Sequence, residues 1–228
     1  AQAPSITSIK LNGSSASSIT VSRGTTVEID VAGRNAGAAG VDGSLQVSFP
    51  QMTASGAASS LDVVPYGGMT GQIIAPGDTC WSRCGGASHR EPARYLFGIA
   101  VAATWASGAT QAATFEFTPP ANGTYTVLVK SAIANTAGTT YYFDPTSGTQ
   151  DQQCEYNVVR TVVVVDPAGA LKVTVKDSNG ALRPGAIVRR CNASWSELDR
   201  KTADGSGVAQ WSGLAVGTYY LQVWYNDE

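Results

Sequence analysis

Charged residues are scarce in this sequence, and their scarcity argues against several kinds of partner. Only 14% of the 228 residues are Asp, Glu, Lys or Arg, and the formal net charge is −2. We therefore expect no basic face that would bind nucleic acid or anionic lipid. No uninterrupted apolar stretch approaches the roughly eighteen residues of a membrane-spanning helix, so no membrane insertion is expected.

Histidine is almost absent as well, which limits the chemistry open to the chain. His89 is the only histidine, so it alone could serve as the base of a serine or cysteine hydrolase. No hydrolase, zinc-protease or phosphate-loop motif surrounds it. Glu116 and Glu155 have no acidic neighbour in sequence with which to form a glycosidase pair. We interpret His89 as an exposed loop residue and expect no catalytic residue, no cofactor and no enzymatic activity.

Long amphipathic helical patterns are also missing, and short alternating segments take their place. In Thr26–Val31 the apolar residues Val27, Ile29 and Val31 alternate with polar ones, which is the period of a half-buried strand. Similar segments separated by turn residues predict eight or more strands before residue 166. Those expected besides Thr26–Val31 are Ile6–Leu11, Leu45–Phe49, Ser60–Val64, Gly71–Ala75, Arg94–Trp105, Ala112–Thr118, Thr124–Ile133, Thr139–Phe143 and Tyr156–Val165.

The last third of the chain contains hairpin chemistry in a recognisable order. Alternating residues after Leu171 are followed by the turn Asp177-Ser-Asn-Gly180, and Gly213-Leu-Ala-Val-Gly-Thr precedes a final apolar strand. This order resembles carboxypeptidase regulatory-like and Cna-B-type modules, which are small prealbumin-like β-sandwiches common in surface proteins. The resemblance covers about the last sixty residues and implies a spacer, stalk or binding platform.

Some Cna-B modules form an internal lysine–asparagine isopeptide bond, and only part of that pattern occurs here. Lys172 precedes Asp177 at the spacing that the resemblance implies for the reactive lysine. No acidic residue occupies the segment Leu221–Trp224, where the resemblance implies the catalytic carboxyl group. A lysine without a buried carboxyl partner has little reason to lose its proton, so we expect no such bond.

The fold class predicted for the whole chain is all-β, with two tandem β-sandwiches. Thr114–Thr118, the turn Pro119-Pro-Ala-Asn-Gly123 and the strand from Thr124 resemble the late hairpin of bacterial immunoglobulin-like domains. Val158–Val165 is nearly all β-branched and is expected to lie centrally and covered. Asp166-Pro-Ala-Gly169 is then the linker. We therefore predict an immunoglobulin-like sandwich over residues 1–166 and a prealbumin-like sandwich over residues 167–228.

Four cysteines in a chain of this composition indicate disulfide bonds in an exported protein. We expect Cys154 to bond Cys80 or Cys84, with a Cys80–Cys84 bond as the alternative. Cys191 is then left to pair across the domain junction or with another chain. Cys80, Cys84 and His89 also have roughly zinc-ligand spacing, and Cys154 could complete such a site. Disulfides are favoured, and no metal site is predicted.

Several features indicate a secreted or cell-surface protein. The start Ala-Gln-Ala-Pro is typical of a mature N-terminus after signal-peptide cleavage. Asn12, Asn122 and Asn192 lie in glycosylation triplets, although the first two are also Asn-Gly hairpin turns. Exposed tryptophans form stacking platforms for sugars, and Trp195 and Trp81 are the candidates. Trp105, Trp211 and Trp224 are interpreted as structural.

Function is predicted from the strand count of the second module. About five strands are expected, whereas related sandwiches have about seven, so the last strand is expected to have an open edge. We predict a non-catalytic extracellular structural protein, a surface or filament subunit that assembles head to tail by strand addition, with Ala3–Leu11 as a candidate donor. The alternative is a carbohydrate-binding or adhesive module. Self-association is the expected partnership, with glycans as a second class of partner.

Overall fold

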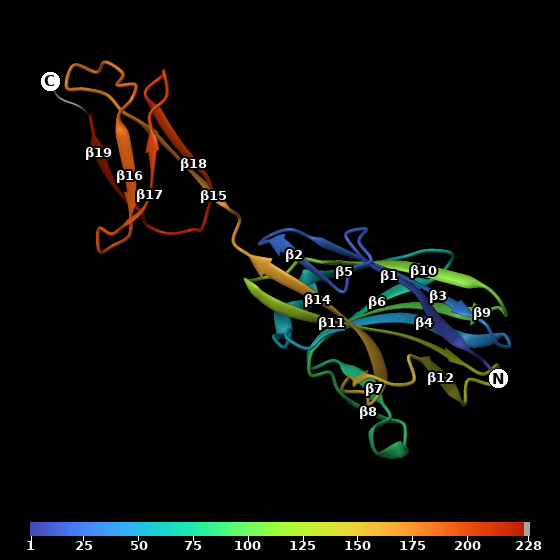
Figure 1. Ribbon diagram of the computed structural model, residues 1–228. Coiled ribbons are helices and arrows are strands. Elements are labelled where there is room, and N and C mark those ends of the chain that lie inside the picture. The colour runs from blue at the N-terminus through green and yellow to red at the C-terminus, as the bar shows by residue number, and fades with distance from the viewer. Residues whose placement is uncertain (226–228) are drawn as a thin grey trace. The chain divides into compact units, whose positions relative to one another are not determined.

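The computed structural model describes residues 1–225 and divides the chain into two compact units, Ala1–Val165 and Asp166–Glu228 (Figure 1). Nearly every element is a strand; the exceptions are two short 3-10 turns, η1 (Ser55–Ser60) and η2 (Cys84–Gly86). No helix in the described part of the chain has the length and hydropathy to cross a membrane. The chain is therefore all-β, as its alternating segments predict.

The first unit contains an antiparallel four-stranded sheet. Its order is β1-β3-β10-β5, and the core side chains come from alternate positions of each strand, such as Val27, Ile29 and Val31 of β3. β3 continues to Asn35, four residues past the end of the expected strand Thr26–Val31. The bounds are β1 (Pro4–Leu11), β3 (Val27–Asn35), β10 (Thr110–Phe117) and β5 (Leu61–Pro65).

The second sheet of this unit is larger and carries the candidate site. Its main path is β13-β14-β11-β4-β9-β6; in addition β12 pairs with β11, and β2 pairs in parallel with β14. Both β4 and β9 are hydrogen-bonded on each side. The bounds are β2 (Ser18–Ser22), β4 (Gly40–Phe49), β6 (Thr70–Ile74), β9 (Leu96–Trp105), β11 (Gly123–Ala134), β12 (Tyr141–Asp144), β13 (Thr149–Gln150) and β14 (Tyr156–Val165).

A continuous core lies between these two sheets. Phe49 and Phe117 stack with ring centroids 4.3 Å apart, and Trp105 is fully buried. The backbone of Gly43 approaches Trp105 so closely that a Cβ would lie 2.7 Å from the indole ring, so a larger residue would force the core to shift. Large aromatic side chains thus fix the spacing of the two sheets.

Strand β14 differs from its predicted burial. It is central, because β11 pairs on one side and β2 on the other. Val162 and Val164 are buried, whereas Val159 and Val165 are 37% and 44% exposed. The strand is therefore central, as predicted, but it is fully covered on one face only, and its other face is partly exposed.

A separate hairpin projects from the large sheet. β7 (Thr79–Ser82) pairs with β8 (His89–Pro92), and η2 forms the connection (Figure 1). Gly85 and Gly86 have φ values of 76° and 82°, which glycine adopts without steric cost. A small apolar cluster of Cys80, Ala93 and Phe97 attaches the hairpin to β9.

The second unit contains two small sheets. One pairs β15 with β18, and the other has the order β17-β16-β19, in which β19 pairs with β16 and with no other strand of the described residues. Six buried residues form the core, with Trp211 the largest. The described part of this unit has five strands, the number expected from the sequence: β15 (Gly169–Thr174), β16 (Ile187–Cys191), β17 (Glu197–Thr202), β18 (Val208–Leu214) and β19 (Tyr220–Trp224).

Candidate functional site

A buried lysine organises one end of the large sheet. Lys130 of β11 is 1% exposed, and its Nζ lies 2.5 Å from Asp151 Oδ2 and 2.6 Å from Gln153 Oε1. It also donates to Glu155. These three acceptors come from the short turn that leads into β14. A buried ammonium needs such partners, because removal from water is costly unless charge and hydrogen bonds compensate.

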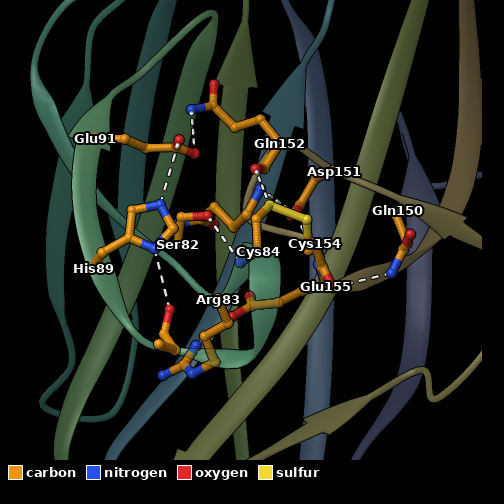
Figure 2. Close-up of a disulfide and its surroundings, with 12 residues drawn as sticks. Ser82, Arg83, Cys84, His89, Glu91, Gln150, Asp151, Gln152, Cys154 and Glu155 are labelled. Atoms are coloured by element: carbon orange, nitrogen blue, oxygen red, sulfur yellow. Dashed lines mark hydrogen bonds and ion pairs between the residues drawn. A yellow bond between two sulfur atoms is a disulfide. The ribbon is translucent and has the colours of Figure 1, made fainter.

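The same turn is attached to the projecting hairpin by a disulfide. Cys84 of η2 is bonded to Cys154, 70 residues later in the sequence, and Arg83 pairs with Glu155 beside it (Figure 2). Cys154 has a φ of 62°, a left-handed backbone conformation that residues other than glycine adopt mainly in turns. The covalent bond and the ion pair together fix the hairpin to the turn.

The other two cysteines carry free thiols. Cys80 and Cys191 are both buried, at 2% and 0% exposure. Of the two partners expected for Cys154, Cys84 forms the bond, and the pairing of Cys191 with another chain stays a prediction. Burial, with a contribution from Glu91, raises the pKa of the Cys80 thiol. The disulfide uses two of the four donors considered for zinc. Within residues 1–225 no cluster of His, Cys, Asp and Glu has the arrangement of a metal site.

A cleft of about 640 Å³ lies between the hairpin and the outer face of the large sheet. This volume is in the range typical of small-ligand sites. Its lining comes from β4, β9 and β6, from the hairpin, and from the segment around β12. Because β4 and β9 are paired on both sides, side chains rather than free backbone groups line this part of the cleft. Glu155 and Gln153 connect it to the Lys130 cluster.

Three aromatic residues and two arginines line the cleft. The guanidinium carbon of Arg83 lies 4.5 Å from the ring centroid of Tyr141 and 4.7 Å from that of Phe143. Arg90 lies 5.1 Å from the ring centroid of Trp81, which is 54% exposed. Arg83 is thus held by Glu155 and two rings. Within residues 1–225 the Arg90 side chain makes this cation–π contact and no ion pair, which leaves most of its donors available.

Polar acceptors complete the lining. Tyr141 donates its hydroxyl to Asp42 at 3.1 Å, and burial, together with the charge of Asp42, raises the pKa of this phenol. Gln46 donates from its Nε2 to Ser44, while its buried Oε1 has no hydrogen-bond partner in the described part of the chain. A buried acceptor without a partner is costly, so Gln46 is suited to receive a donor from a ligand.

The second unit presents a different feature, an open strand edge. β17 and β19 are the two edge strands of one sheet. β17 carries Glu197, Asp199 and Arg200, which form ion pairs with each other and with β16. β19 carries no charged side chain, and Val223 and Trp224 are 46% and 42% exposed. Charges protect edges from pairing, so only β17 is protected.

The residues predicted as candidates lie in separate places. Trp81 lines the cleft, whereas Trp195 lies in the second unit, 51% exposed and 5.2 Å from the ring of Tyr220. His89 is exposed, and its Nε2 lies 3.7 Å from Glu91 (Figure 2). Glu155 is held by two cations. The glycosylation candidates are exposed turn or loop residues: Asn12, Asn122 and Asn192.

Sequence reasoning missed the Lys130 cluster and the roles of Tyr141 and Phe143. One signal was present, because Lys130 interrupts the apolar strand Thr124–Ile133. A lysine inside such a strand predicts carboxylate partners. The sequence does not show which carboxylates these are, because Asp151 and Glu155 lie in a turn that comes next to β11 only in the folded chain.

No protein-family model and no curated protein matches this chain. Solved structures similar to it include a variant of BcpA, the major pilin subunit of Bacillus cereus, at 13% identity and a TM-score of 0.38 over 97% of this chain. The Bacillus anthracis TIE protein is 15% identical over 95% of this chain, with a TM-score of 0.42. A C-terminal fragment of the Streptococcus agalactiae major pilin GBS80 is 9% identical over 97%, with a TM-score of 0.35, and 85% of that fragment is covered.

This chain covers 59% of the BcpA structure and 34% of the TIE structure. Similarity at this level assigns no function to this chain. The resemblance of the last third to Cna-B-type modules therefore remains a prediction from its sequence.

Proposed function

We propose that this chain is a non-catalytic structural protein of a cell surface or extracellular filament, whose copies associate head to tail through the open edge of β19. The observation that carries the proposal is the contrast between the two edges of one sheet, one charged and one apolar. An uncharged, exposed edge strand recruits a further strand.

The expected donor segment needs correction. Pro4–Leu11 is β1, which pairs with β3 along its whole length, and Ile9 and Leu11 lie in the core at 5% and 0% exposure. Removing this strand to donate it would expose the core of its own unit. The donor is therefore another edge strand of a second copy. A contact between different surfaces of two copies extends into chains, as a filament requires.

An extracellular location is consistent with the disulfide Cys84–Cys154, because such bonds persist in oxidising compartments. The cleft in the first unit then faces an environment that contains glycans. Asn12, Asn122 and Asn192 remain candidate glycosylation sites on exposed turns.

Sedimentation of the full chain over a range of concentrations tests the assembly. The sheet offers a matched pair of exposed apolar residues, Val223 on β19 at 46% and Leu198 on β17 at 48%. We expect Val223→Lys to abolish concentration-dependent association, because a lysine protects an edge, and Leu198→Lys to leave it unchanged. Wild-type protein that stays monomeric at high concentration, or equal loss in both variants, would contradict the proposal.

Carbohydrate binding is a second candidate function, and the cleft favours it. An exposed indole, amide groups and hydroxyls around a cavity of about 640 Å³ match a sugar, which offers an apolar ring face and many hydroxyls. Binding to a glycan array that is lost in Trp81→Ala and kept in Trp195→Ala would place the site in this cleft.

A further inference from the structure

Some charged side chains around the cleft are paired with an opposite charge of the protein, and others are not. Glu155 is bound by Lys130 and Arg83, so its charge is neutralised within the protein. Arg83 is in turn committed to Glu155 and to the rings of Tyr141 and Phe143. Neither of these two charges is available to a ligand without breaking an existing pair.

Arg90 is the exception among the cations that line the cleft. It is exposed on β8, lies over Trp81, and has no ion pair with any carboxylate in residues 1–225. Its guanidinium therefore presents a planar set of donors that matches a carboxylate. Arg90 lies over one face of the Trp81 indole, and Trp81 as a residue remains 54% exposed.

The opposite part of the lining presents acceptors. Asp42 accepts a hydrogen bond from Tyr141 and has no ion pair within the described chain, and Gln46 Oε1 has no partner there. These groups suit hydroxyl donors. A ligand that satisfies both parts has a carboxylate at one position and hydroxyl groups at others, with an apolar face for the indole.

We propose that this cleft binds a carboxylate-bearing sugar, a uronic or sialic acid, with the carboxylate on Arg90 and the ring against Trp81. The inference rests on carbohydrate binding, the second candidate function. An acidic peptide is disfavoured because the lining also presents the acceptors Asp42 and Gln46 Oε1, which suit the hydroxyl groups that Asp and Glu side chains lack.

Calorimetric titration of the full chain with defined probes tests this inference. The acidic probes are trigalacturonate and sialyllactose, which separate the uronic from the sialic source. The neutral counterparts are methyl-esterified trigalacturonate and lactose. We expect at least one acidic probe to bind more tightly than its neutral counterpart, and we expect added salt to weaken the binding of that acidic probe.

Two variants and a matched control locate the contact. Arg90→Gln is expected to weaken binding of the preferred acidic probe about tenfold and leave the neutral probe within about twofold, since a charge-assisted hydrogen bond is lost. Trp81→Ala should weaken both. Arg94→Gln removes an equally exposed charge that does not line the cleft and should change neither.

Two results would overturn this inference but keep carbohydrate binding as a function. In the first, binding depends on Trp81 but acidic and neutral probes bind equally well. In the second, the acidic probe binds more tightly, but Arg90→Gln does not reduce that preference. Absence of binding to all four sugars would overturn both. Equal binding of a tetraglutamate peptide would also overturn it, because the site would then recognise charge without a sugar.

Discussion

The first unit encloses a continuous core of large side chains between two sheets, whereas the second unit has six buried core residues. The first unit also contains the disulfide and the buried Lys130 cluster. In the second unit the charged groups lie on the strands at the surface, as in the pair Arg190–Asp199. Surface pairs contribute little to stability, whereas loss of one partner of a buried pair is costly.

This difference matches the functions proposed for the two units. A rigid scaffold is needed to hold a hairpin over a cleft, and the disulfide and the Lys130 cluster attach that hairpin at its base. An assembling edge needs only a sheet that leaves one strand available. Breaking the polar links should therefore affect the first unit far more than the second.

Replacing the buried lysine should have the largest effect. Lys130→Met leaves Asp151 and Glu155 buried without one of their cations, and we expect a loss of about 3–5 kcal/mol in the free energy of unfolding of the first unit. Hydrogen exchange followed by mass spectrometry measures both units in the intact chain. Lys10→Met, at an exposed position of β1, is the control. A loss below about 1 kcal/mol would show that the cluster is not a stabilising unit.

Removing the disulfide should have the next largest effect. It closes a loop of 70 residues, so the variant Cys84→Ser/Cys154→Ser should lose about 2–4 kcal/mol, again in the first unit only. Addition of a reductant should destabilise the wild type and leave the double variant unchanged. A peptide map that joins Cys154 to Cys80 instead would contradict the pairing.

Much of the fold was predictable, because one-sided burial imposes an alternating pattern on the sequence. β3 and β15 follow that pattern, and the structure places strands at both segments. β2 was missed because Ser18–Ser22 is short and pairs in parallel with β14, far along the chain. The β7–β8 hairpin was missed because its strands are short and Gly85 and Gly86 between them are typical of a loop.

The candidate site was less predictable than the fold. Trp81 was identified as an exposed aromatic, but its partners on β12 and the turn before β14 are brought to it by tertiary packing. The cysteine pairing remained open for the same reason: Cys80 and Cys84 lie in one segment, and only the hairpin decides which of them reaches Cys154. Local pattern specifies strands, whereas a site depends on which strands meet.

The smallest expected effect is the acid response of the second unit. The side-chain hydrogen bond from Arg190 lowers the pKa of Asp199, and Trp211 also donates to Asp199 at 2.9 Å. Because the pKa of Asp199 is lower in the folded than in the unfolded chain, its ionisation stabilises the fold at pH values above the unfolded pKa of about 3.9. This contribution is lost as the pH falls through the folded pKa.

We therefore expect the melting temperature of the second unit to fall modestly as the pH is lowered below about 4, with a shallower fall in Asp199→Asn. The effect is small because the Asp199 side chain is 41% exposed and screened by solvent. Calorimetry of the full chain across this pH range measures it. Parallel curves for the wild type and the variant would show that the ionisation of Asp199 contributes nothing to the stability of the second unit.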